Sequence, residues 1–306
     1  MGSMEQFPDL PPPPVSEGCY RHPHVETKVH CTRCGRPICP DCMIPASVGH
    51  HCPTCVAEAR AEYRRGPGRR AAIAGVKGTS ATRALLTIIV GVYVIEVING
   101  GVASFVGGPP VDVLFRLGGS FGLAIASGQY WRLFTSMFLH ASLIHLAFNS
   151  YALWIFGSIV EPEIGRWRFL TVYLLTGLAA AASSYAFQPS PEIVGIGASG
   201  AVFGIFGVFL VYNYRRRYTA LGAARLRQGL IMLALNLFLG FSISGIDWRA
   251  HVGGLIAGSV AGLSLDARGP EPFRRLAYVG MVVGVTALTV GLVVWRTGSL
   301  HRQFGL

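Results

Sequence analysis

The sequence predicts an all-α polytopic membrane protein that is preceded by a small metal-binding module. Of its 306 residues, 51% are hydrophobic and only 13% are charged, about half the charged share of an average soluble domain. The mean hydropathy is +0.47. The apolar residues gather in runs close to membrane-spanning length, and all seven cysteines lie before them, between residues 19 and 55. This composition indicates an integral membrane protein.

The first 58 residues hold a tail and a candidate metal module. Residues 1–15 are rich in proline and are predicted to be disordered. Residues 16–58 carry metal-ligating side chains in four pairs with two residues between the partners: Cys19 and His22, Cys31 and Cys34, Cys39 and Cys42, Cys52 and Cys55. Eight such ligands are enough for two tetrahedral zinc sites. A segment of about 40 residues buries too little apolar surface to fold alone, so we expect zinc to stabilise it.

Alternating use of the four pairs would give a cross-braced module similar to a B-box or RING-type zinc finger. The first and third pairs would then bind one zinc ion, and the second and fourth pairs the other. Four further histidines could replace a ligand: His24, His30, His50 and His51. Disulfides are the alternative use of these cysteines, but their spacing and a reducing cytosol favour metal.

Residues 59–82 are predicted to form a basic juxtamembrane linker. Seven Lys or Arg residues lie between positions 60 and 83. Such charges are typical of an anchor beside the anionic lipids of the inner leaflet. Nucleic-acid binding is the alternative, but because any membrane anchor carries such charges we expect no nucleic-acid partner.

Seven apolar runs follow and predict seven transmembrane helices. They cover residues 84–99, 143–160, 168–187, 199–214, 228–244, 250–265 and 276–295. A spanning helix needs about 20 residues, so several of these runs are close to the minimum. We assign six helices to a core over residues 83–266, and the seventh helix with the C-terminal tail to residues 267–306. The connection over residues 100–142 is too long and too apolar for a simple loop.

The distribution of Lys and Arg predicts the orientation in the membrane. With the N-terminus inside, the inner segments hold 17 basic residues and the outer segments five, and the other four lie in the cysteine-rich module. Cytoplasmic loops carry an excess of Lys and Arg. We therefore expect a cytosolic N-terminus and an external C-terminus.

Ser199 is the candidate nucleophile, in a Gly-rich apolar stretch over residues 195–207. We expect it in the first turn of a helix, where backbone N–H groups lack intrahelical partners. A serine needs a base, and His251 at the start of a later apolar helix is the best candidate. Alone, each residue has a structural explanation: Ser199 as a small residue between helices, His251 as an interhelical hydrogen bond.

Small residues on the two helices explain how Ser199 and His251 meet. Glycines at helical spacing can face each other and let the backbones approach closely. They are Gly200, Gly204 and Gly207 on one helix and Gly254, Gly258 and Gly262 on the other.

Other polar residues in or near the apolar runs have different expected roles. His145 and Asn149 are four residues apart, so they share a helix face and can both donate hydrogen bonds to a developing oxyanion. Glu96 lies near the outer end of the first helix, where we expect its carboxylate to reach water. Asp247 precedes His251 by four residues and is expected in a loop.

Four motifs in chain order resemble the rhomboid family of intramembrane serine proteases. They are Trp131-Arg132, then His140-x4-His145-x3-Asn149, then Gly197-Ala198-Ser199-Gly200, then Ala250-His251-x2-Gly254-x3-Gly258. The resemblance implies a six-helix core, a Ser199–His251 dyad, and an oxyanion hole of His145, Asn149 and the Ser199 backbone N–H. Phe203 stands where the family often has tyrosine, and we expect its ring to stack on His251.

The resemblance implies an intramembrane serine endopeptidase of a bacterial plasma membrane. It would cleave transmembrane segments of membrane proteins near the outer face, with a small residue before the cleaved bond. Its partners would be these substrates, the lipid bilayer and a cytosolic protein bound by the zinc module, and catalysis would need no cofactor. The alternative is a catalytically inactive rhomboid-like protein that binds transmembrane helices, with the zinc module as a cytosolic interaction domain.

Overall fold

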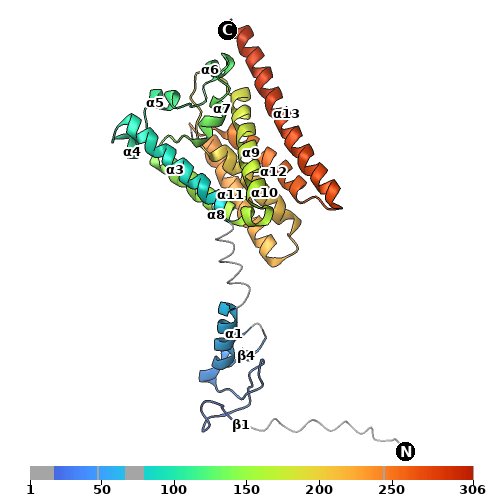
Figure 1. Ribbon diagram of the computed structural model, residues 1–306. Coiled ribbons are helices and arrows are strands. Elements are labelled where there is room, and N and C mark those ends of the chain that lie inside the picture. The colour runs from blue at the N-terminus through green and yellow to red at the C-terminus, as the bar shows by residue number, and fades with distance from the viewer. Residues whose placement is uncertain (1–16, 47, 66–78, 244, 306) are drawn as a thin grey trace, which may run out of the picture. The chain divides into compact units, whose positions relative to one another are not determined.

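The structure is a computed structural model that describes residues 17–46, 48–65, 79–243 and 245–305. The chain divides into two compact units, Met1–Ala74 and Gly75–Leu306 (Figure 1). The predicted Pro-rich tail and residues 66–78 of the predicted linker lie outside the described residues. Of the described residues in the predicted linker, 59–65 and 80–82 are helical and Thr79 is an N-cap residue.

The N-terminal unit is built from two short hairpins and one helix. Its elements are β1 (Glu17–Gly18), β2 (Glu26–Thr27), η1 (Pro40–Cys42), β3 (Ile44–Pro45), β4 (His50–His51) and α1 (Pro53–Arg65). β1 pairs with β2 and β3 with β4, both antiparallel. The buried side chains of this unit are six of the seven cysteines and Ile38, with Thr27. A core made mainly of thiols supplies little hydrophobic stabilisation.

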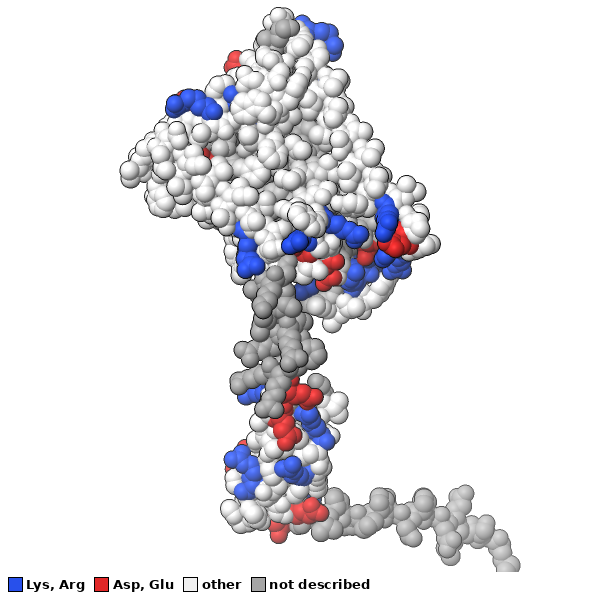
Figure 2. Space-filling model, in the orientation of Figure 1, with Lys and Arg blue, Asp and Glu red and all other residues white. Residues whose placement is uncertain are grey.

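The second unit is a bundle of seven long helices. They are α3 (Ser80–Gly100), α8 (Leu143–Ile164), α9 (Arg166–Phe187), α10 (Ser199–Arg215), α11 (Ala220–Ser242), α12 (Trp248–Leu265) and α13 (Glu271–Phe304). Among the described residues, five helices are long and apolar enough to cross a membrane: α3, α8, α9, α11 and α13. On the face in Figure 2, the middle of this unit is nearly free of charged side chains, and most of its arginines lie at one end. The predicted all-α polytopic membrane fold is confirmed.

Of the two long helices that do not meet the membrane criterion, α10 lies inside the bundle, whereas α12 buries one face and exposes Ile256, Val260 and Leu263 on the other. α10 has 17 residues and α12 has 18. Every residue of α10 from Gly200 to Phe209 is buried by neighbouring helices. A helix enclosed by protein needs neither the length nor the hydropathy of one that faces lipid, because its neighbours replace the lipid around it.

Glycines set the contact between α10 and α12, as the sequence predicted, with one change of partner. A Cβ on Gly254 would overlap the carbonyl of Gly200, and a Cβ on Gly258 would overlap that of Gly204. Gly207 lies against the α12 backbone at Leu255 and Ser259, whereas Gly262 faces valine side chains of α10 rather than Gly207. Only glycine, which has no side chain, allows two helix backbones to approach this closely.

Short helices fill the predicted embedded connection between α3 and α8. They are α4 (Ser104–Gly107), α5 (Val111–Arg116), α6 (Gly122–Ala126), α7 (Arg132–Thr135) and η2 (Ser136–Phe138). Arg132 is 4% exposed, and its Nη1 donates to the carbonyls of Phe115 (2.6 Å) and Gly119 (3.0 Å). Its guanidinium also lies over the Trp131 ring, 4.7 Å from the centroid. Arg132 therefore supplies donors to backbone carbonyls at and after the end of α5, where the backbone is irregular.

Glu161 joins the C-terminal part of α8 to the start of α3. Its carboxylate is fully buried and accepts the backbone N–H groups of Ala81 (2.9 Å) and Thr82 (2.7 Å), together with the Thr82 hydroxyl. These are first-turn groups of α3, where a negative charge also complements the helix dipole. Glu161 therefore caps a neighbouring helix.

α13 is 34 residues long, well beyond the predicted run of residues 276–295. Its last turns pack against the short helices and α9 instead of lipid: Leu300 is fully buried, and the hydroxyls of Thr297 and Tyr185 lie 2.9 Å apart. The His301 Nε2 also lies 2.8 Å from the Ala126 carbonyl. The prediction from apolar runs did not include this extension because its residues are largely polar.

We predict that Gly258→Ala destabilises the bundle, because the new Cβ would overlap the Gly204 carbonyl. Overpacking of this kind costs about 1–3 kcal/mol. Thermal unfolding of the detergent-solubilised chain should therefore show a lower midpoint.

Gly284→Ala is the matched control, because a Cβ there meets open space within α13. It should leave the midpoint unchanged or raise it slightly, since alanine is the better helix former. Equal midpoints for the two variants would contradict a backbone-to-backbone contact of α10 with α12.

Candidate active site

An extended segment leads into Ser199 and is fixed to the short helices. Gly195 exchanges both backbone hydrogen bonds with Ser120, at 2.8 and 2.9 Å. The Gly197 N–H donates to the Ser136 carbonyl at 2.9 Å. Three hydrogen bonds thus hold the backbone of residues 195–197 before α10 begins at Ser199.

Gly197 allows the close approach of His145. Its φ of +126° lies in the region that favours glycine, and a Cβ there would come within 2.9 Å of the imidazole Cε1 and 3.0 Å of Nε2. The same position is 3.7 Å from the Ser199 Oγ. Because Gly197 has no side chain, His145 and Ser199 can face each other across the space that a Cβ would fill.

Ser199 is the first residue of α10 and is half-buried, next to the fully buried Ala198. As a first-turn residue, its N–H group has no acceptor within the helix. The hydroxyl and the backbone N–H of Ser199 therefore both lie at the start of α10, next to the imidazole of His145.

His251 lies in the first turn of α12 and is also half-buried. Its ring stacks on Phe203, one turn after Ser199, with 4.3 Å between centroids and 9° between planes. The Ala250 carbonyl lies 3.7 Å from the Cβ position of Gly200. The structure thus brings the residues next to His251 against those next to Ser199, and the stacking expected of Phe203 is present.

The hydrogen bonds of His145 identify which ring nitrogen carries its proton. Ser142 caps α8 by accepting the His145 N–H (3.2 Å), and the Ala141 N–H donates to Nδ1 of the imidazole at 3.3 Å. A ring nitrogen that accepts a hydrogen bond is unprotonated, so the proton of the neutral ring is on Nε2. That N–H is the one beside Gly197 and Ser199.

Asn149 follows His145 by one turn, as predicted, and is 6% exposed. Its Nδ2 is buried and makes no hydrogen bond within the described residues. A buried donor without a partner is costly, and such groups call for a functional explanation. An oxyanion would supply the missing acceptor.

Glu96 does not reach water, contrary to the sequence-based expectation. It is fully buried, and its two carboxylate oxygens lie 3.1 and 3.3 Å from the backbone N of His140. The buried His140 ring in turn packs edge-on against His145, with 5.2 Å between centroids. Glu96 therefore helps to position the segment that carries His145, and a carboxylate within an apolar run was the signal for such a role.

Asp247 caps the start of α12 and does not hydrogen-bond the imidazole of His251. One carboxylate oxygen accepts the N–H groups of Arg249 and Ala250, both at 3.2 Å, and the other accepts the Ser184 hydroxyl. This is an N-cap arrangement. Within the described ranges, no carboxylate makes a hydrogen bond to His251.

The cysteine-rich unit forms two groups that could hold metal ions. One contains Cys19, His22, Cys39 and Cys42, and the other contains Cys31, Cys34, Cys52 and Cys55. Within each group the ligand atoms lie within 4.8 Å of one another. These are the two sets that alternate use of the pairs predicts, and neither includes His24, His30, His50 or His51.

The geometry and the acidity of the thiols fit a dication. The Cys34 and Cys52 sulfurs are 3.7 Å apart, close to the edge of about 3.8 Å of a tetrahedron with zinc–sulfur distances of ~2.3 Å. Burial raises the pKa of the Cys19 thiol, but hydrogen bonds from backbone N–H groups outweigh this and lower it to about 6. Burial and the neighbouring thiols raise the pKa of Cys42 to about 11. A cation would relieve this repulsion.

Comparison with known proteins agrees with this fold. The Rhomboid domain family matches residues 127–268. Rhomboid protease GluP of Bacillus subtilis is 36% identical over 208 residues, which cover 67% of this chain and 38% of that protein. Putative rhomboid protease YdcA of the same organism is 36% identical over 138 residues, 45% of this chain and 68% of that protein.

A plant protein extends the likeness beyond bacteria. RHOMBOID-like protein 6, mitochondrial, of Arabidopsis thaliana is 32% identical over 217 residues, covering 63% of this chain and 69% of that protein. The fold and the polar site define a polytopic membrane protein with serine, histidine and asparagine gathered at one end of its helices. The chain belongs to the rhomboid family, although its match spans little more than a third of GluP.

Proposed function

We propose that the chain is an intramembrane serine endopeptidase that uses a Ser199–His251 dyad. The observation that carries this proposal is the meeting of the Ser199 hydroxyl and the His145 Nε2–H beside Gly197. The unpartnered amide of Asn149 lies one turn along α8 from His145, and His251 lies on the helix adjacent to α10. Relatives named as rhomboid proteases support peptide-bond hydrolysis as the reaction.

In this proposal, the neutral imidazole of His251 takes the proton of the Ser199 hydroxyl as its oxygen attacks the carbonyl carbon of the scissile bond. The protonated imidazole then gives that proton to the leaving amine as the carbon–nitrogen bond breaks. Water, deprotonated by the same imidazole, hydrolyses the resulting ester and restores Ser199. Stacking on Phe203 holds the His251 ring in place through both steps.

Three donors would stabilise the oxyanion that forms at each step. They are the Ser199 backbone N–H, the His145 Nε2–H and the Asn149 side-chain amide. Each gains a charge-assisted hydrogen bond only as negative charge develops on the carbonyl oxygen. The three donors would therefore stabilise the transition state more than the bound substrate, which lowers the activation barrier. The buried, unpartnered Nδ2 of Asn149 fits this role.

The substrates would be transmembrane segments of membrane proteins, cleaved near the outer face of the bilayer. The site lies at the start of α10, and the arginine-rich segment that follows Tyr214 lies at the opposite end of the same helix. Only a segment that leaves its helical conformation there exposes a peptide bond to Ser199. A small residue before the cleaved bond is expected from the family.

We predict that Ser199→Ala and His251→Ala each abolish cleavage, because the two residues act as a unit. Asn149→Ala should leave a folded enzyme whose kcat is lower by about 10²–10³, the usual cost of one oxyanion donor. The measurement is cleavage of a panel of transmembrane substrates in liposomes.

Ser127→Ala is the matched control, because this exposed serine bonds only the Leu123 carbonyl of its own turn. A serine-reactive fluorophosphonate should label the wild type and this control but not Ser199→Ala. Full activity of Ser199→Ala would overturn the protease proposal. A wild type that binds transmembrane helices without labelling or cleavage would support the inactive, helix-binding alternative.

We further propose that the N-terminus is cytosolic and the C-terminus external in a bacterial plasma membrane. The excess of basic residues in the inner segments supports this orientation. A reporter fused after Leu306 should therefore behave as external and one fused before Cys19 as cytosolic. A cytosolic signal from the C-terminal fusion would refute the assignment.

The N-terminal unit is proposed to bind two zinc ions and to act as a cytosolic interaction module. Its four cysteine-containing pairs match the ligand types that structural zinc prefers, and its thiol-rich core is too small to fold unaided. When bound, zinc would offset part of the negative charge of the thiolates in each group. In this proposal, its role is structural and catalysis needs no metal.

We expect two zinc ions per chain, and we expect chelation to unfold residues 16–58 while cleavage continues, because the dyad contains no metal ligand. Metal content per chain and protease activity before and after chelation test this. Cys31→Ser should lower the content to about one ion, since three ligands bind structural zinc weakly. A wild-type content of one ion or none, or loss of cleavage with the bundle still folded, would disprove this prediction.

A further inference from the structure

A shallow groove lies where α10 meets α11, at the end of the bundle opposite Ser199. Its volume is about 440 Å³, and it is lined by Arg217, Ala223, Leu226, Arg227, Leu230, Ile231 and Ala234. The apolar members form one stripe along α11, and Arg217 comes from the turn after α10. Two guanidinium groups therefore stand at the head of an otherwise apolar groove.

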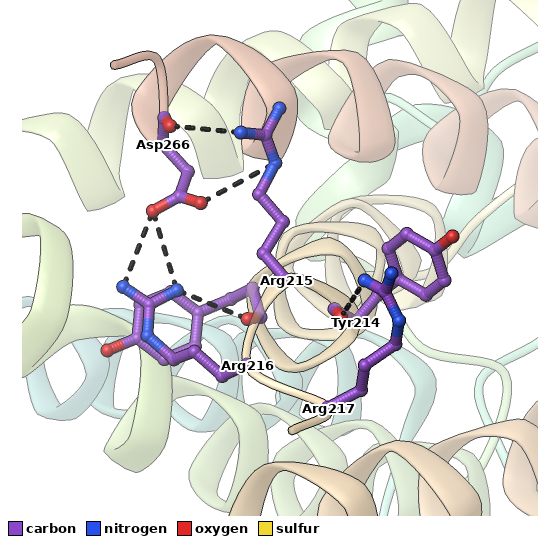
Figure 3. A network of polar contacts seen from close by, with 6 residues as sticks. Tyr214, Arg215, Arg216, Arg217 and Asp266 are labelled. Carbon is purple, nitrogen blue, oxygen red and sulfur yellow. Dashed lines mark hydrogen bonds and ion pairs between the residues drawn. The ribbon is translucent and has the colours of Figure 1, made fainter. Parts of the chain in front are cut away.

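The neighbouring arginines share an acidic partner, which sets the two groove arginines apart. Arg215 and Arg216 both pair with the Asp266 carboxylate, at 3.5 and 3.3 Å. Arg217 turns away from that carboxylate and lies beside Tyr214 (Figure 3). Arg227 makes no hydrogen bond or ion pair in the part of the chain that the structure describes. The groove thus carries two positive charges without a protein counter-charge.

Arg217 is held in place although it has no acidic partner. Its Nη1 donates to the Tyr214 carbonyl (2.9 Å) and its Nη2 to the Tyr218 hydroxyl (2.6 Å). Its guanidinium also lies 4.2 and 4.5 Å from the centroids of the same two tyrosine rings. A guanidinium ordered in advance loses less entropy when it binds an anion.

The apolar stripe has the length of a lipid chain in one leaflet. Residues 223–234 rise about 17 Å along the helix, and half of the hydrocarbon core of a bilayer is about 15 Å. Leu230 and Ile231 on this stripe are 51% and 56% exposed, so the protein itself does not cover them. A free phosphate would use only the arginine end of the groove, whereas a phospholipid would use both parts.

We propose that this groove binds an anionic phospholipid, with the phosphate at Arg217 and Arg227 and an acyl chain along α11. Guanidinium groups bind phosphate oxygens through charge-assisted hydrogen bonds, and the inner leaflet that faces this arginine-rich end is the anionic one. The lipid would bridge two helices that share little protein contact, since the buried residues of α11 are three glycines: Gly222, Gly229 and Gly240.

The test uses the full-length chain in detergent with dioleoylphosphatidylglycerol, dioleoylphosphatidylcholine or inorganic phosphate added separately. Native mass spectrometry gives the dissociation constant, and the unfolding midpoint gives the stabilisation. The wild type should bind the phosphatidylglycerol about tenfold more tightly than the phosphatidylcholine. The reason is that the phosphatidylglycerol headgroup has a net negative charge for the two arginines to bind, whereas the phosphatidylcholine headgroup has none. Inorganic phosphate at the same concentration should not raise the midpoint.

The double variant Arg217→Gln with Arg227→Gln should lose the preference for phosphatidylglycerol while keeping its midpoint in phosphatidylcholine. The control is Arg225→Gln with Arg274→Gln, which removes the same charge from α11 and α13 outside the groove and should keep the preference. Equal affinity of the wild type for both lipids, equal stabilisation by inorganic phosphate, or equal loss in the two double variants would each overturn the proposal.

Discussion

The backbone contact between α10 and α12 is the constraint on which the rest of the bundle depends. Gly254 and Gly258 lie against the carbonyls of Gly200 and Gly204, so the helix axes approach as closely as the main chains allow. Association in lipid gains little from the hydrophobic effect, so close packing must supply the stabilisation. The glycines next to Ser199 and His251 therefore decide both how these helices pack and how near the two side chains come.

Buried polar groups then fix the elements that surround this contact. Arg132 satisfies carbonyls of the short helices, Glu161 caps α3, and Glu96 accepts the N–H of His140. In lipid an unsatisfied backbone group costs several kcal/mol, so irregular backbone persists only where the protein supplies partners. Each of these side chains is costly to bury alone. Glu96 and Arg132 position the segments next to His145 and Gly195, whereas Glu161 fixes the opposite end of α3.

Much of the fold and of the candidate metal groups could be predicted from the sequence. The apolar runs gave the number of long helices, and the metal-ligand pairs fell into the two expected groups because chelating spacing is a local property. Glu96 was misjudged, because only the tertiary structure shows that its end of α3 is covered by the segment at His140. The last turns of α13 were missed because Arg296 and Thr297 pack on protein, which a hydropathy pattern does not register.

The length of α10 has a consequence for where the proposed chemistry takes place. Its 17 residues rise only about 25 Å, less than the ~30 Å of a hydrocarbon core. If Arg215 stays among the headgroups at one end, Ser199 lies below the opposite membrane surface. A hydrolase at that depth needs a polar route for water. In the proposed site the side chains of His145, Asn149 and Ser199 would line such a route, and a helix enclosed by protein rather than lipid is what allows α10 to be this short.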